Sequence, residues 1–66
     1  MQITVNGKAR QLAEGTSLTE LVREVSDRET GIAVAVNNEV VPRGTWDSTS
    51  IRGGDRIDVV TAVQGG

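Results

Sequence analysis

The sequence predicts an α+β fold in which a mixed sheet of four to five strands carries one main helix across one face. Three observations lead to this prediction. Apolar and polar residues alternate from Met1 to Val5, and a segment that begins at Leu18 repeats its apolar residues with helical spacing. Further along, the run Ile32 to Val36 is continuously apolar and has the length of a strand. We therefore expect one domain over residues 1–63, followed by a flexible tail, residues 64–66.

The first two strands are expected to form a hairpin. Asn6-Gly7 directly follows the alternating segment Met1 to Val5 and suits a two-residue type I′ turn, in which both residues take positive φ. Residues Lys8 to Leu12 would then return antiparallel as the second strand. We interpret Asn6-Gly7 as turn chemistry and assign it no binding function.

A helix of about nine residues is predicted next, because apolar residues no longer recur at every second position but about every 3.6 residues, which is the period of an α-helix. Glu14-Gly15-Thr16 interrupts the strand pattern, and Ser17 with Glu20 fits a capping box at the helix start. The apolar stripe that would cover the sheet comprises Leu18, Leu21, Val22 and Val25. The opposite face is charged and is expected to be solvated.

The apolar run Ile32 to Val36 is expected to be a central strand. It would be covered on both faces, or it would pack closely through its small residues Ala33 and Ala35. After a turn at Asn37-Asn38, a short strand from Glu39 to Val41 should lie at an edge or end at Pro42, since proline has no N–H to donate to a ladder.

Residues Arg43 to Ser50 show no clear period. Trp46 is the only aromatic residue of the sequence, and we expect it in the core or at its rim, with contact to a partner as the alternative. Arg43 is expected to be a solvated arginine, with contact to a partner as the alternative. Gly53-Gly54 is interpreted as a turn that supplies positive φ, because no helix pattern follows it as a phosphate-binding loop would require.

The last strand is expected to span Ile57 to Val63. If the helix covers the crossover, the first and last strands would be parallel neighbours at the centre of the sheet. Val60, Ala62 and Val63 would then leave apolar surface beside the tail, and we regard them as candidate partner-binding residues. Packing against a neighbouring strand is an equal alternative for Val60, whereas partner contact is favoured for Val63.

Composition excludes several function classes. The sequence has no Cys and no His, which excludes disulfides, zinc sites of the Cys/His type, thiol nucleophiles and Ser-His relays. Seven basic and nine acidic residues are spread along the chain, so we expect no nucleic-acid partner. The longest apolar run is far too short to cross a bilayer and no signal segment is present, which predicts a cytoplasmic protein with no membrane partner.

The sequence ends Val63-Gln64-Gly65-Gly66, which would place two glycines against a free carboxylate. Because glycine has no Cβ, such an end is narrow enough to enter a tight enzyme channel. A carboxylate is a poor electrophile, so chemistry at Gly66 needs prior activation, most economically as an acyl-adenylate made from ATP. The chain would be the substrate of that reaction and not its catalyst. A frayed end without function is the alternative.

Three segments together carry a resemblance to a known family: the stretch Val36-Asn37-Asn38-Glu39-Val40-Val41-Pro42-Arg43, the Gly54-Asp55 turn, and the ending Val63-Gln64-Gly65-Gly66. With the expected order of strands and helix, they resemble the ThiS family, the sulfur carrier proteins of thiamin biosynthesis, over essentially the whole chain. The resemblance implies a ubiquitin-like β-grasp fold. The stretch from Val36 to Arg43 discriminates best, since other ubiquitin-like proteins share the Gly-Gly ending.

The resemblance also implies a mechanism and its partners. In this family an adenylating enzyme of the ThiF type uses ATP to activate the terminal carboxylate, here that of Gly66. Sulfur from a cysteine desulfurase relay then replaces AMP and gives a thiocarboxylate, which thiazole synthase (ThiG) consumes. Gly65 and Gln64 would form the slender tail, and the surface near Val60 and Val63 would dock on partners. The chain itself would bind no cofactor.

Two alternatives remain at this point. The chain could carry sulfur for another pathway, such as molybdopterin or cysteine synthesis, because the chemistry of the tail would be the same. It could also be a ubiquitin-like protein modifier or a plain binding module, with Gly66 forming an isopeptide bond or no bond at all.

Overall fold

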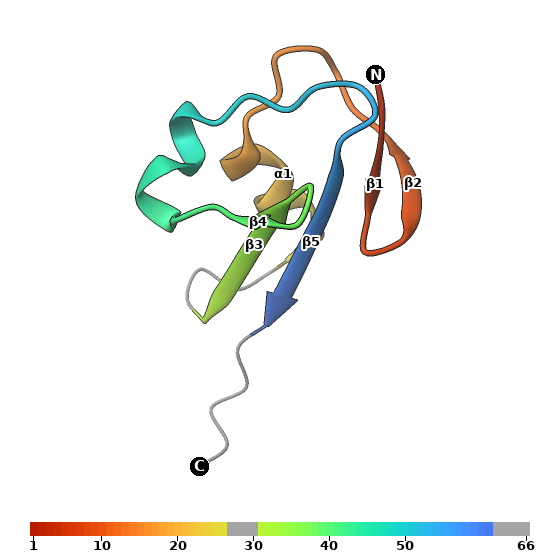
Figure 1. The fold of residues 1–66 in the computed structure, drawn as a ribbon. Coiled ribbons are helices and arrows are strands. Elements are labelled where there is room, and N and C mark those ends of the chain that lie inside the picture. Colours follow the sequence, from red (N-terminus) through yellow and green to blue (C-terminus); the bar gives the residue numbers. More distant parts are fainter. Residues whose placement is uncertain (27–30, 62–66) are drawn as a thin grey trace.

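The computed structural model describes residues 1–26 and 31–61. Five strands, one α-helix and one 3₁₀ helix follow one another along the described part of the chain. In order, they are β1 (Gln2–Val5), β2 (Lys8–Gln11), α1 (Leu18–Val25), β3 (Ile32–Val36), β4 (Glu39–Val40), η1 (Arg43–Ser48) and β5 (Arg56–Thr61). Figure 1 shows the strands as one layer with α1 packed across it, as the sequence predicts.

The strands form one mixed sheet in the order β2-β1-β5-β3-β4. The central pair β1 and β5 is parallel, which confirms the predicted pairing of the first and last strands, whereas the other pairs are antiparallel. Val5 lies opposite Ile57, and Val34 lies opposite Val59. Because strand neighbours in register share a face, these residues all point toward α1.

The β1–β2 hairpin turns at Asn6 and Gly7, whose φ angles of 51° and 82° confirm the predicted two-residue turn. The side chain of Asn6 also forms two hydrogen bonds with β5, which the sequence did not indicate. Its Oδ1 accepts a hydrogen bond from the Val59 backbone N–H at 2.8 Å, and its Nδ2 donates to the Val59 carbonyl at 3.2 Å. The turn therefore continues the β1–β5 pairing through a side chain, and it fixes the part of β5 that leads to the C-terminus.

The substitution Asn6→Gly should lower the free energy of unfolding by about 1–2 kcal/mol, since it removes two hydrogen bonds while glycine takes positive φ without strain. A chain of this size would lose roughly 4–8 °C in Tm for each kcal/mol. Asn38→Gly is the matched control, because Asn38 also has positive φ, 70°, but makes no side-chain hydrogen bond to the described residues. Thermal unfolding of both variants checks the prediction, and equal Tm values would contradict it.

The start of α1 follows the predicted capping box. Ser17 Oγ accepts from the Glu20 backbone N–H at 3.2 Å, and Glu20 Oε1 accepts from the Ser17 N–H at 3.4 Å. The apolar stripe faces the sheet as predicted: Leu18, Leu21 and Val22 are buried and Val25 is half-buried. The helix has eight residues and ends at Val25.

The core lies between α1 and the sheet and closes at one end over Trp46. Its buried members are Ile3, Val5, Leu12, Leu18, Leu21, Val22, Val34, Trp46, Ile51 and Ile57. The indole Nε1 of Trp46 donates to the Val41 carbonyl at 2.9 Å, which satisfies the polar atom of a buried ring. The prediction for Trp46 is confirmed, but the surrounding segment is the 3₁₀ helix η1, which the sequence pattern did not indicate.

Two strand predictions need correction. Only one face of β3 is covered: Val34 is buried while Ala33 is exposed, so the alternative of coverage on both faces was wrong. The short strand β4 ends at Val40 and not at Val41, although the Val41 N–H still donates to the Val34 carbonyl at 2.9 Å in the register of β3 and β4. The next residue, Pro42, has no N–H with which to extend the ladder. The edge position predicted from Pro42 is confirmed. The end predicted for the last strand, residues 62–63, lies outside the described residues.

Candidate functional site

The sheet has an open face, the face opposite α1. The strand registers place Val40 opposite Ala35 and Val60 opposite Ala33, and these four residues all lie on that face. We call them the open-face patch. It spans the three strands β5, β3 and β4, so residues far apart in the sequence form one continuous surface.

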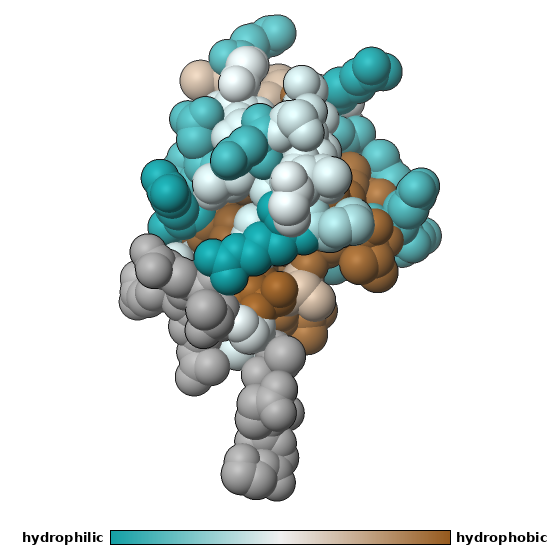
Figure 2. Space-filling view, turned by 90° about the vertical axis from the view of Figure 1, so that its left-hand side faces the viewer, coloured by the Kyte–Doolittle hydropathy of each residue, from teal (hydrophilic) through white to brown (hydrophobic). Residues whose placement is uncertain are grey.

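The open-face patch is apolar and exposed. Val40 is 72% exposed and Val60 is 57% exposed, and these are the only exposed large hydrophobic residues in the described part of the chain. In Figure 2, brown apolar surface gathers low on the right, above the grey atoms at the bottom. An exposed apolar group that joins neighbouring strands typically marks a contact with another molecule.

One border of the patch is charged. Asp58 lies opposite Ala35 in the β3–β5 register, and its Oδ2 is 3.5 Å from Nε of Arg56 on the same strand. Both residues belong to the open face, because they alternate with the buried Ile57. The patch thus has an apolar centre and a charged border on β5, and protein interfaces likewise combine an apolar centre with polar residues at the edge.

Of the predicted site residues, only Val60 lies in the described part of the chain. Val60 is exposed next to Ala33, so its cross-strand neighbour does not cover it and its side chain is accessible. Ala62, Val63, Gln64, Gly65 and Gly66 lie outside the described residues. Val40 was not predicted as a site residue, because a strand of two residues shows no period and only its pairing with Ala35 places it on this face.

Arg43 lies beside the ring of Trp46. Its guanidinium carbon lies 5.9 Å from the centre of the Trp46 ring, within the range of a cation–π contact. Arg43 is nevertheless exposed, in agreement with the expectation of a solvated arginine.

Residues 1–26 and 31–61 contain neither a membrane-spanning helix nor a metal-binding group of side chains. This part of the chain contains no helix that is long and apolar enough to span a membrane. It also contains no group of three or more acidic residues that could hold a metal ion, and the sequence has no His or Cys to add to one.

Comparison with known proteins identifies similar chains over the full length. A family model described as the ThiS family matches residues 3–66. The sulfur carrier protein ThiS of Escherichia coli (strain K12) is 36% identical over 66 residues, and the match covers 100% of both chains. The crystal structure of a thiamine biosynthesis protein (ThiS) from Geobacter metallireducens superposes with a TM-score of 0.84 at 32% identity, again over 100% of both chains.

A third relative is much longer. The thiazole synthase of Paramagnetospirillum magneticum is 26% identical over 66 residues, which are 100% of the present chain but only 20% of that protein. One polypeptide therefore contains a segment similar to this chain and is named for thiazole synthesis.

Proposed function

This chain belongs to the ThiS family, and we propose that it carries sulfur for thiazole formation in thiamin biosynthesis as a thiocarboxylate on Gly66. The observation that carries the proposal is the full-length match to a sulfur carrier protein, since it includes the residues of the Gly-Gly ending as well as the β-grasp domain. In this role the chain is a protein cosubstrate that enzymes act upon, and not an enzyme.

The proposed chemistry has two stages. An adenylating enzyme of the ThiF type joins the Gly66 carboxylate to the α-phosphorus of ATP, which gives an acyl-adenylate and releases pyrophosphate. A persulfide supplied by a cysteine desulfurase relay then bonds to the carbonyl carbon through its outer sulfur while the bond to AMP breaks, and a second thiol cleaves the S–S bond, which leaves the thiocarboxylate and a disulfide. ATP is bound by the partner, so this chain needs no cofactor of its own.

We propose that the scaffold presents the reacting end within reach of the open-face patch. β5 carries Val60, and Gly66 is the fifth residue after Thr61, so even a fully extended chain can place the terminal carboxyl no farther than about 18 Å from Thr61. We propose that partners dock on the open-face patch, together with Ala62 and Val63, and receive Gln64, Gly65 and Gly66 in a narrow channel.

Direct contact with thiazole synthase (ThiG) is part of the proposal. In Paramagnetospirillum magneticum a thiazole synthase contains a segment similar to this whole chain. Covalent linkage of two domains raises their effective concentration and is favoured where one must hand a group to the other. We infer that the separate chain makes the same transfer by docking, and that it acts in the cytoplasm.

Mass spectrometry of the intact protein and of its C-terminal fragment tests the proposal. The chain is incubated with ATP, a sulfur donor and the ThiF-type enzyme, and omission of ATP is the control. We expect oxygen to be replaced by sulfur on the fragment that contains Gly66. Assignment to that fragment is necessary because oxidation of Met1 gives nearly the same gain in mass. A thiol alkylator gives an independent readout, since the sequence has no cysteine.

Two results would contradict the sulfur-carrier proposal: an unmodified Gly66 in the presence of active enzyme, or an isopeptide bond between the Gly66 carboxyl and a lysine of another protein. The first result would favour a binding module and the second a protein modifier.

A further inference from the structure

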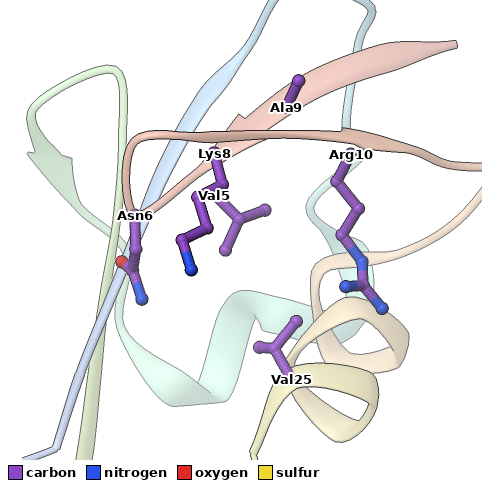
Figure 3. A pocket seen from close by; sticks show the side chains of 6 residues that line it. All are labelled: Val5, Asn6, Lys8, Ala9, Arg10 and Val25. Carbon is purple, nitrogen blue, oxygen red and sulfur yellow. The ribbon is translucent and has the colours of Figure 1, made fainter.

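A groove lies between the β1–β2 hairpin and the C-terminal end of α1, away from the open-face patch. Its volume is about 440 Å³, and its lining residues are Val5, Asn6, Lys8, Ala9, Arg10 and Val25. Figure 3 shows Lys8 and Arg10 extending from β2 toward α1 while Val25 points back at them, and Ala9 points away. The groove therefore has an apolar floor, formed by Val5 and Val25, beneath two cationic side chains.

The backbone of β2 has free hydrogen-bonding groups beside this groove. Met1 and Leu12 exchange both backbone hydrogen bonds, at 2.7 and 2.8 Å, and such pairs alternate along an antiparallel ladder. With Gln2 opposite Gln11 and Thr4 opposite Ala9, the N–H and C=O groups of Ala9 and Gln11 point away from β1. Within residues 1–26 and 31–61, no other strand pairs with β2.

The charges beside this edge favour an acidic occupant. Arg10 Nη2 is 3.1 Å from Glu24 Oε1, and the two side chains are 39% and 51% exposed, so this ion pair is weak and accessible. Arg10 Nε is buried and has no hydrogen-bond acceptor among the described residues. A buried N–H without an acceptor costs free energy, and a carboxylate in the groove would satisfy it.

A second copy of this chain fits the edge poorly. Two β2 strands paired with each other would bring Lys8 and Arg10 of one copy beside the same residues of the other, and like charges across a ladder are destabilising. Lysine on an edge strand also protects against such pairing. The same two cations favour a strand that carries carboxylates at alternate positions.

We propose that the β2 edge binds an extended acidic segment of a partner protein, which adds a sixth strand to the sheet with its carboxylates facing Lys8 and Arg10. The backbone groups of Ala9 and Gln11 would supply the hydrogen bonds, as in other cases of strand addition. β2 and β4 are opposite edges of the sheet, and Lys8 and Arg10 face α1 whereas the open-face patch faces the other way. Both surfaces can therefore be occupied together. This second interaction does not depend on the sulfur-carrier function.

Titration of the ¹⁵N-labelled protein with a synthetic peptide, acetyl-Gly-Val-Glu-Val-Glu-Val-Gly-amide, tests the proposal at low ionic strength. The largest amide shifts are expected at Ala9 and Gln11. The double substitution Lys8→Glu, Arg10→Glu should weaken binding about tenfold or more, because two attractive cross-strand pairs become repulsive. Arg52→Glu is the control for one charge reversal outside the groove, since Arg52 is exposed and does not line the groove, and it should leave the affinity unchanged.

Ala9→Pro is a second test, directed at the backbone. Proline at this position removes an outward N–H that β1 does not use, so the hairpin should fold while strand addition is blocked. Loss of the shifts at Gln11 would support the proposal even if the charge-reversed variant proved unstable. Shifts centred on Ala33 and Val60, equal binding of a peptide with Lys in place of Glu, or undiminished binding by Ala9→Pro would each overturn it.

Discussion

Deletion of Gly66 is expected to reduce thiocarboxylate formation by at least about a hundredfold, since misplacement of a reacting group by as little as 1 Å can have an effect of that size. The deletion withdraws the terminal carboxyl by one residue, about 3.3–3.6 Å along an extended chain. It leaves a carboxylate on Gly65 with the same chemistry. The prediction therefore concerns position in the active site of the adenylating enzyme and not the reactivity of the group.

The same deletion should leave the fold intact. The described core residues all lie between Ile3 and Ile57, so no buried contact among them involves Gly66. Pyrophosphate release and mass spectrometry of the C-terminal fragment measure the reaction, and thermal unfolding measures stability. Glu14→Gln, an exposed substitution in the turn before α1, is the control and should retain both properties. A clear fall in Tm on deletion of Gly66 would show that the tail is structural and would contradict this interpretation.

The hairpin and α1 could be predicted from sequence because neighbouring residues determine them. Asn6-Gly7 specifies a turn by the φ angles that it tolerates, and Ser17 with Glu20 caps a helix within one turn of chain. The parallel pairing of β1 with β5 followed from the position of the helix between them. It needed no information about individual side-chain contacts.

The 3₁₀ helix η1 could not be predicted because contacts from other segments stabilise it. Thr19 Oγ1 of α1 donates to Asp47 Oδ1 at 2.5 Å, and the Trp46 indole bonds to the Val41 carbonyl. A helix held in this way needs no apolar period of its own. The bonds of Asn6 to Val59 span 53 residues and were equally invisible in the sequence.

The candidate site was predicted only in part for a related reason. Val60 stood out because it belongs to a strand with clear alternation beside the tail. Val40 lies in a strand of two residues, which is too short to show a period, and only the sheet register brings it to the same face. The cationic groove combines β1, β2 and α1, so no single segment of the sequence could indicate it.

Val60→Asp should weaken binding to the ThiF-type adenylating enzyme by roughly thirty- to a hundredfold, which corresponds to about 2–3 kcal/mol for an unpaired carboxylate in an apolar contact. The side chain is 57% exposed in the free protein, so the charge should disturb the fold little. Val40→Asp should act in the same direction, because Val40 belongs to the same patch and is 72% exposed. Calorimetric titration of each variant with the enzyme gives the affinities.

Gln2→Asp is the control that distinguishes loss of an apolar contact from a general effect of added negative charge on the affinity. Gln2 is exposed on the open face but lies on β1, outside the patch, so this substitution adds the same charge without entering the proposed contact. Weakening by Val60→Asp and Val40→Asp but not by Gln2→Asp is the expected pattern, and it would identify the open-face patch as the docking surface. Equal weakening by all three would instead indicate long-range repulsion from an acidic enzyme. Unchanged affinity in both valine variants would remove the patch from the interface and leave the C-terminal residues alone to bind the enzyme.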